Sequence, residues 1–248
     1  MQDRRSTPLA STCEAPHACP LPVRLAVLSR TPYFSGLDGE TIRSIDDHML
    51  VRGYHEGEQV YRAGDDATRL FVLATGQVKV IRPSLGGQDV LVDVLTAGSP
   101  FGTLTTLGEA VYSDTAEAMT VSCALSISAE DFREVVSRHP SVALAALDDL
   151  AHRLEAARES VRRLSGGTVE QRVAATLLTL VDKLGEPRDG SILLQLPLTR
   201  ADLAAMTGST TESVSRVMSR FKRDGVIDSG RRWTSVLDRD RLAALGTS

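Results

Sequence analysis

Residues 199–225 read TRADLAAMTGSTTESVSRVMSRFKRDG, which contains two short helical patterns separated by a glycine. Thr199 begins the first pattern, and Gly208 interrupts it. The series Ser209-Thr-Thr-Glu212 then has the form of a capping box, which opens a second helix. The apolar residues of this second helix recur at the spacing of one buried face: Val214, Val217, Met218 and Phe221. Two short helices joined by a tight turn with glycine predict a helix-turn-helix.

The opposite face of the second helix carries side chains that can read base edges in a major groove. Arg216 can donate two hydrogen bonds to guanine, Glu212 can accept one from cytosine, and Ser215 can contact a thymine or a phosphate. For Glu212 the alternative is a purely local role in the capping box. Basic residues on the flanks suit phosphates better than bases. The candidate DNA contacts are Thr211, Glu212, Ser215, Arg216, Ser219, Arg200, Arg220, Arg231 and Arg232.

Charge and the following segment support a nucleic-acid site at this end of the chain. Residues 1–165 carry 16 Lys and Arg against 22 Asp and Glu, whereas residues 166–248 carry 12 against 10. A locally basic module on an acidic body is compatible with DNA binding, although a solvated charged face gives the same balance. Strand-like runs at 225–227 and 233–237 predict a short ribbon, and therefore a winged helix-turn-helix.

A heptad pattern precedes this module. Apolar residues follow one another at intervals of 4, 3, 4, 3, 4 and 3, which is the seam of a coiled coil: Ala143, Leu147, Leu150, Leu154, Ala157, Val161 and Leu164. Charged residues flank this narrow stripe, and we therefore expect a parallel homodimer helix. The alternative is that the stripe lies against the chain's own β-domain. The run Ser165-Gly-Gly167 ends the helix and marks a hinge.

Between residues 51 and 128 short β-type runs alternate with glycines, which predicts an antiparallel jelly roll. The expected fold is therefore α+β, with an N-terminal antiparallel β-roll, a long dimerisation helix and a C-terminal winged helix-turn-helix. The expected boundaries are a flexible arm at 1–27 that carries Cys13 and Cys19, a β-roll sensor domain at 28–138, the dimerisation helix at 139–165 and the DNA-binding domain at 166–248.

Composition excludes several classes of protein. The chain has 248 residues with 42% hydrophobic and 24% charged residues, which is typical of a globular protein. It has no apolar run of membrane-spanning length, and its first residues lack the apolar core of a signal peptide, so we expect a cytoplasmic protein. The sequence contains no P-loop, no Ser/His/Asp arrangement and no zinc-ligand spacing among its five histidines, which argues against an enzyme.

The chain resembles the CRP/FNR family of bacterial transcription regulators over nearly everything after residue 28. The likeness is carried by EGEQVYRAGD at Glu56–Asp65, LATGQV at Leu73–Val78, Phe101-Gly102, the long helix and the winged helix-turn-helix. In the reading helix, Glu212-Ser-Val-Ser-Arg216 is similar to the E-x-x-S-R pattern of the FNR branch. The resemblance implies a homodimer on an inverted repeat with TTGA-like half-sites, RNA polymerase as a partner, and a signal sensed in the β-roll.

The resemblance also implies an effector pocket at Gly102, Thr103, Asp114 and Thr115. Relatives that bind cyclic AMP have F-G-E-L and R-S/T-A here, whereas this chain has Phe101-Gly-Thr-Leu104 and Asp114-Thr-Ala116. A carboxylate in place of the arginine that pairs the cyclic phosphate repels the ligand, so cyclic AMP is not expected. A ligand-binding regulatory subunit without DNA binding is the alternative function, which the polar reading face disfavours.

The cysteines are similar in part to the ligands of an iron–sulfur cluster in oxygen-sensing FNR proteins. The spacing of Cys13 and Cys19 matches the later half of C-x2-C-x5-C, and Cys123 stands where the β-roll ligand is expected. One thiolate is missing, and His17 is a candidate fourth ligand. We expect redox or oxygen sensing through such a cluster; the alternatives are a small-molecule effector other than cyclic AMP, a thiol switch, or no effector, with the thiols as small core residues.

Overall fold

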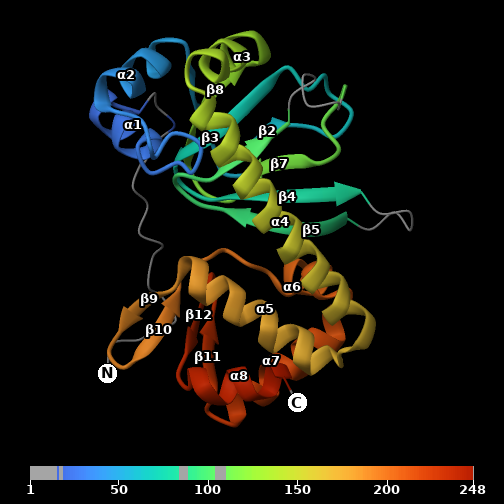
Figure 1. Cartoon of the computed structure of the whole chain (residues 1–248). Coiled ribbons are helices and arrows are strands. Elements are labelled where there is room, and N and C mark those ends of the chain that lie inside the picture. Colours follow the sequence, from blue (N-terminus) through green and yellow to red (C-terminus); the bar gives the residue numbers. More distant parts are fainter. Residues whose placement is uncertain (1–15, 17–18, 84–88, 104–109, 248) are drawn as a thin grey trace. The chain divides into compact units, whose positions relative to one another are not determined.

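The computed structural model describes residues 16, 19–83, 89–103 and 110–247 (Figure 1). The chain divides into two compact units, one made mainly of residues 11–87 and 92–156 and the other mainly of residues 157–248. In the part of the chain that is described, no helix is long and apolar enough to cross a membrane.

The N-terminal unit is built on two four-stranded sheets, with strand orders β1-β8-β3-β6 and β2-β7-β4-β5. Strand β8 pairs antiparallel with β1 and β3, and β7 pairs antiparallel with β2 and β4. The strands are β1 (Leu50–Tyr54), β2 (Gln59–Tyr61), β3 (Arg69–Thr75), β4 (Val78–Pro83), β5 (Asp89–Leu95), β6 (Pro100–Gly102), β7 (Thr115–Ala118) and β8 (Ser122–Ser128). This arrangement, visible in Figure 1, confirms the expected antiparallel β-roll.

Strand β3 shows why the sheets are layered as they are, because its alternating side chains enter two different cores. Val72 packs in a cluster with residues of three helices, α1 (Leu21–Leu28), α2 (Gly39–Asp47) and α3 (Ala129–Arg138). Phe71 and Leu73 pack in a second cluster with residues of the other sheet. The β1-β8-β3-β6 sheet is therefore buried on both faces. Residues 21–27, which we expected in a flexible arm, instead belong to helix α1.

Helix α4 runs from Pro140 to Gly166, and its first part is attached to the β-roll by a chain of polar contacts. The hydroxyl of Tyr33 donates to Asp149 at 3.2 Å, and Arg153 pairs with the same carboxylate at 2.8 Å. The Arg153 guanidinium also donates to the carbonyl oxygen of Pro100 at 2.7 Å, at the start of β6. These contacts fix one side of α4 and leave other sides exposed.

The C-terminal unit is built around helix α5 (Val169–Leu184), which packs on the other three helices of the unit. Thr168 caps α5 in a capping box with Gln171. A four-stranded sheet of order β11-β12-β10-β9 completes the unit. Its remaining elements are β9 (Glu186–Arg188), β10 (Ser191–Leu194), α6 (Arg200–Thr207), α7 (Thr211–Arg223), β11 (Ile227–Gly230), β12 (Trp233–Val236) and α8 (Arg239–Thr247).

Candidate nucleic-acid interface

Helices α6 and α7 form the expected helix-turn-helix. Thr199 and Asp202 cap α6 in a reciprocal capping box. The helix ends at Gly208, whose backbone is left-handed with φ of 54°, a conformation that favours glycine. Helix α7 begins at Thr211 and buries the four predicted apolar side chains, Val214, Val217, Met218 and Phe221. The turn and the buried face therefore hold α7 with its polar face outward.

The start of α7 differs from the sequence prediction in one respect that concerns Glu212. The predicted capping box from Ser209 to Glu212 is wrong, because Thr210 is the N-cap and its hydroxyl accepts from the backbone N–H of Ser213. Ser209 instead belongs to the turn. Glu212 is thereby left out of the cap, and its side chain, 80% exposed, lies 3.6 Å from that of Arg216, 72% exposed. The local capping role considered for Glu212 does not occur.

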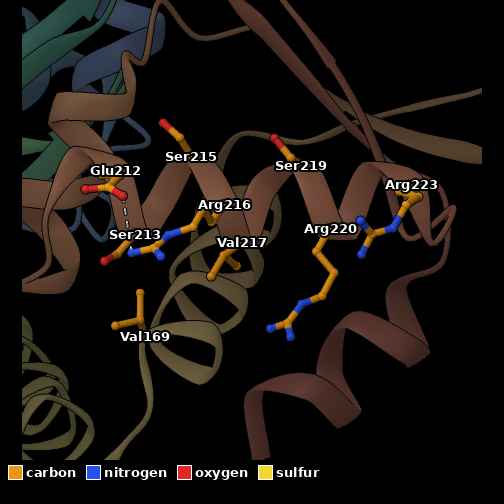
Figure 2. Close-up of a pocket in the computed structure, with 9 residues that line it drawn as sticks. All are labelled: Val169, Glu212, Ser213, Ser215, Arg216, Val217, Ser219, Arg220 and Arg223. Atoms are coloured by element: carbon orange, nitrogen blue, oxygen red, sulfur yellow. Dashed lines mark ion pairs between the residues drawn. The ribbon is translucent and has the colours of Figure 1, made fainter.

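The outer face of α7 borders a groove of about 680 Å³ whose lining includes five of the polar residues predicted to read or hold DNA. Figure 2 shows Glu212 and Arg216 close together near the start of the helix, with Arg220 and Arg223 following toward its end. The groove is lined by Val169, Glu212, Ser213, Ser215, Arg216, Val217, Ser219, Arg220 and Arg223. Thr211, also a predicted contact, is exposed in the first turn of α7. The structure thus brings a carboxylate, hydroxyls and guanidinium groups onto one open face.

Two of the basic residues predicted to contact DNA also form contacts within the C-terminal unit. The guanidinium of Arg220 is paired with Glu170 of α5, so it also holds α7 against its own unit. Arg200 donates to Ser229 at 3.3 Å, and burial lowers the pKa of its guanidinium. These contacts give Arg200 and Arg220 a structural role besides the phosphate contacts that the sequence predicts.

The other two predicted phosphate contacts lie at the turn of the wing. Arg231 and Arg232 fall between β11 and β12, and both are exposed. Arg232 adopts a left-handed backbone with φ of 68°. Trp233, which follows them, is buried at the start of β12. The buried tryptophan anchors the base of the wing, and the two exposed arginines place positive charge at the tip of the wing.

The predicted seam of α4 is exposed along its length in the single chain. The larger seam side chains are between 46% and 63% exposed: Leu147, Leu150, Leu154, Val161 and Leu164. Ala143 is half-buried, and Ala157 is exposed. Large apolar side chains in water are unfavourable by about 25 cal/mol for each Å² of apolar surface. Within the N-terminal unit, Leu147, Leu150 and Leu154 do not lie against the β-roll, which was the alternative interpretation.

The predicted effector pocket lies beside a cluster of stacked aromatic rings. The hydroxyl of Tyr61 donates to the carboxylate of Asp114 at 2.9 Å, and the Tyr61 and Tyr112 ring centroids are 4.0 Å apart. Burial raises the pKa of Tyr61, and the Asp114 carboxylate raises it further. Thr115 accepts a hydrogen bond from the backbone of Ala63 at 3.0 Å.

Gly102 lies in β6 and Thr103 directly after it, both half-buried, and the residues that follow, 104–109, are not described. At Asp114, where the family's phosphate-binding arginine is expected, the described chain thus offers a carboxylate with a tyrosine hydroxyl bonded to it. These residues do not fit a cyclic phosphate, because the group placed to meet the anion is itself negative.

The described thiols are both in the apolar core of the N-terminal unit. Cys19 is 2% exposed and Cys123 is 1% exposed, and they belong to the same cluster. The sulfur of Cys19 lies 3.7 Å from the hydroxyl oxygen of Thr75, and Thr75 is the register partner of Cys123 in the sheet. Cys13 and His17 lie outside the described residues. Residues 16, 19–83, 89–103 and 110–247 hold no group of three or more His, Cys, Asp or Glu arranged for a metal.

Sequence reasoning missed Arg172, whose guanidinium donates hydrogen bonds to two separate segments of the C-terminal unit. It donates to the backbone of Gly167 at 2.6 Å and to that of Thr207 at 2.7 Å. Its position in the sequence could have indicated a structural role, because Arg172 directly precedes Val173, which belongs to the buried apolar face of α5. An arginine at such a position needs acceptors, and carbonyl groups at nearby helix ends provide them.

Comparison with known proteins agrees with this geometry. Residues 171–245 match the model of the Crp-like helix-turn-helix domain, and residues 51–139 match that of the cyclic nucleotide-binding domain. The cyclic AMP receptor protein of Thermus thermophilus is 33% identical over 202 residues, which cover 81% of this chain and 89% of that protein. The transcriptional activator protein FnrL of Cereibacter sphaeroides is 30% identical over 211 residues, 83% of this chain and 84% of that protein.

The structure of FixK2 from Bradyrhizobium japonicum has the same fold, with a TM-score of 0.72 and 23% identity over 81% of this chain and 98% of that one. Fold and site together define a DNA-binding regulator with a β-roll domain of the cyclic-nucleotide-binding type. The chain belongs to the CRP/FNR family of transcription regulators, as its sequence motifs predict. The matching families and relatives are regulators of transcription, not enzymes.

Proposed function

We propose that the protein acts as a homodimer that binds a palindromic operator with TTGA-like half-sites and controls transcription from it. In this proposal the outer face of α7 enters the major groove, where Arg216 reads guanine and Glu212 reads cytosine. The wing arginines, Arg231 and Arg232, contact phosphates together with Thr211, Arg200 and Arg220. RNA polymerase is the further partner that such a regulator requires.

The observation that carries the proposal is the pairing of Glu212 with Arg216 on an open helix face. Both side chains are more than 70% exposed, and the cap of α7 uses neither of them. A salt bridge at this exposure contributes little to stability, about 0–1 kcal/mol, so stability does not account for it. The salt bridge keeps the Arg216 guanidinium beside Glu212 at the groove, where it can exchange the carboxylate for a base edge.

The exposed seam of α4 supports the dimer. A second copy of the same helix would cover the leucines on both chains, as the heptad spacing requires. A two-fold dimer presents two identical reading helices, and these suit half-sites about 34 Å apart on one side of the duplex. The symmetry of the protein is then matched by the palindrome.

The proposed test is selection of bound sequences from a random pool of duplexes by the full-length protein, with sedimentation of the same sample. We expect an enriched inverted repeat with TTGA-like half-sites and a dimer in solution. A pool that shows no enriched sequence would contradict the proposal and favour a ligand-binding regulatory subunit that does not use DNA.

The signal acts, in this proposal, on the N-terminal unit, and cyclic AMP is not the signal. The pairing of Tyr61 with Asp114 supports the exclusion of cyclic AMP, because an anionic ligand would face a carboxylate. An iron–sulfur cluster would be held by Cys13, Cys19 and Cys123, with His17 as a further donor, and when bound it would supply sensitivity to oxygen. An iron–sulfur cluster takes about four donors, and Cys19 and Cys123, which lie in the same buried cluster of residues, would provide two of them.

A further inference from the structure

Arg172 of α5 joins two segments of the C-terminal unit that are far apart in the sequence. Its Nη1 donates to the carbonyl oxygen of Gly167 at 2.6 Å. Its Nε donates to the carbonyl oxygen of Thr207 at 2.7 Å, and its Nη2 donates to the hydroxyl of Ser209 at 3.1 Å and to the carbonyl of Gly208 at 3.5 Å. One planar side chain therefore holds both the link between α4 and α5 and the turn between α6 and α7.

Both of these segments lie next to the elements that the proposed function uses. Gly167 directly follows the end of α4, the helix that carries the exposed seam. Thr207, Gly208 and Ser209 form the turn that leads into α7, whose N-cap is the next residue, Thr210. Leu164, the last residue of the seam, contacts this turn as well, because its Cδ2 lies 3.4 Å from where a Cβ on Gly208 would be.

The chemistry of these contacts requires arginine. The carbonyl groups at the end of a helix have no partner within the helix and need an external donor. A guanidinium offers five N–H donors in a fixed plane, so it can satisfy acceptors of two segments at once and hold their separation. A lysine keeps the charge but places it at a single point on a flexible stem, and glutamine removes the charge altogether.

We propose that Arg172 is a positioning residue for DNA recognition: it fixes the start of the reading helix relative to the end of the seam helix. In a dimer joined along α4, this connection sets the distance and the angle between the two copies of α7. Arg172 therefore determines which separation of half-sites the protein prefers, although it need not touch DNA itself. The inference rests on the proposed function, since it needs a dimer that reads two half-sites.

The test compares full-length wild type with Arg172→Gln and Arg172→Lys. Arg239→Gln is the matched control, since it removes a guanidinium of the same unit that pairs with Asp182 at 2.9 Å, between α8 and α5. Each protein is titrated by fluorescence anisotropy against four duplexes. These are the palindrome selected by the wild type, the same palindrome with one central base pair inserted, a duplex with a single half-site, and a random duplex.

For Arg172→Gln we expect affinity for the palindrome to fall about tenfold, the result of losing several charge-assisted hydrogen bonds that hold the two segments together. Affinity for the single half-site should change by less than about twofold, since the face of α7 is intact. The preference for the original spacing over the lengthened one should be largely lost. Arg172→Lys should fall between wild type and Arg172→Gln, and Arg239→Gln should behave as wild type.

Two results would overturn the inference while leaving the proposed function in place. One is a parallel loss of affinity for the palindrome and for the single half-site, which indicates that Arg172 only supports the fold of the helix-turn-helix. The other is an unchanged preference for spacing. If circular dichroism shows that Arg172→Gln is unfolded, Arg172→Lys decides by the same criteria. A wild type that does not distinguish the palindrome from the random duplex would overturn the proposed function, and this inference with it.

Discussion

At the scale of single residues, Arg216 has the most informative position on the outer face of α7. Its side chain is 72% exposed and lies 3.6 Å from that of Glu212. We expect Arg216→Ala to weaken operator binding by about 1–3 kcal/mol and to relax the choice of base at one position of each half-site. Anisotropy titrations against duplexes that vary every position in turn would measure this. Arg223→Ala, at the end of the same helix, is the control that should keep the full sequence preference; a preference unchanged in Arg216→Ala would refute its assignment.

Arg231 at the turn of the wing should behave differently, because a phosphate contact carries no sequence information. We expect Arg231→Ala to weaken binding to operator and random duplex alike. The slope of log K against log salt concentration should become shallower by about one, since one fewer counterion is released. Titrations between low and moderate salt measure this slope. A change confined to the operator would mean that Arg231 reads bases.

Tyr33 makes a pH-dependent contribution to stability. Burial raises its pKa to about 12, with Arg153 lowering it and Asp149 raising it to smaller extents. The unfolded chain ionises Tyr33 near pH 10 and the folded chain only near pH 12, so its contribution is complete below pH 10 and is lost as the pH rises to 12. A pKa raised from 10 to about 12 corresponds to a loss of about 2–3 kcal/mol of stability over this range.

Urea denaturation of wild type and Tyr33→Phe between pH 8 and 12 tests this expectation. Near neutral pH the variant should be less stable by roughly 1 kcal/mol, because the hydrogen bond to Asp149 is absent. Between pH 10 and 12 its stability should fall less steeply than that of the wild type. Tyr54, Tyr61 and Tyr112, whose pKa values burial also raises, remain in both proteins and provide the common background. Equal slopes would show that Tyr33 ionises normally.

The sequence did not predict contacts between side chains that lie far apart along the chain. The spacing of Glu212, Ser215 and Arg216 along one helix predicts that they share a face, and they do. The pairing of Arg220 with Glu170 depends on how α5 packs against α7, which no local pattern contains. The same holds for Arg172 and the turn at Thr207. Ser209 and Thr210 are both good N-caps by type, and packing of the turn decided between them.

At the scale of elements, helices α4, α6 and α7 followed from their periodicity and caps, whereas helix α1 and several strands did not follow from their sequences. The runs at Leu70–Leu73 and Val90–Leu95 are rich in β-branched and apolar residues, and both form strands. Strand β7 reads TAEA, which has little strand propensity, and it forms because β2 and β4 pair with it on either side. Tertiary pairing therefore overrides local preference in the β-roll.

The seam of α4 gives the prediction at this scale. Leu150 is 49% exposed in the single chain and lies in the middle of the heptad pattern. We expect Leu150→Asp to destabilise the dimer by about 3–5 kcal/mol, because the carboxylate would be buried without a partner in the helix pair. Sedimentation velocity over a range of protein concentrations measures the dissociation. His152→Asp adds a carboxylate at an 80% exposed side chain off the seam and should leave the dimer intact. A Leu150→Asp variant that remains dimeric would refute the heptad interpretation.

At the scale of the whole molecule, the proposed function requires that a signal received by the N-terminal unit reaches α4. The chain of contacts from Pro100 through Arg153 and Asp149 to Tyr33 offers one physical connection, because β6 carries Phe101 and Gly102 of the predicted effector region. A ligand or a redox change can shift the equilibrium only by as much as it favours one arrangement of these groups over the other. The sequence predicted the two domains and the helix between them, but not this connection, whose members come from β6, from α4 and from the segment between α1 and α2.

The nature of the signal is open to a direct measurement on freshly prepared protein. If Cys13, Cys19 and Cys123 hold an iron–sulfur cluster, protein isolated without oxygen should be brown, contain iron and sulfide, and lose its colour in air. Cys123→Ser should remove the colour, whereas Ser126→Ala, a neighbour in β8 without a thiol, should retain it. Operator affinity should change on exposure to air only in the protein that holds the cluster. A colourless, metal-free protein that binds its operator equally well with and without oxygen would contradict the cluster. In that case Cys19 and Cys123 act as small core residues, in keeping with their burial, and the predicted effector region around Tyr61 and Asp114 becomes the place to seek a ligand that is not an anion.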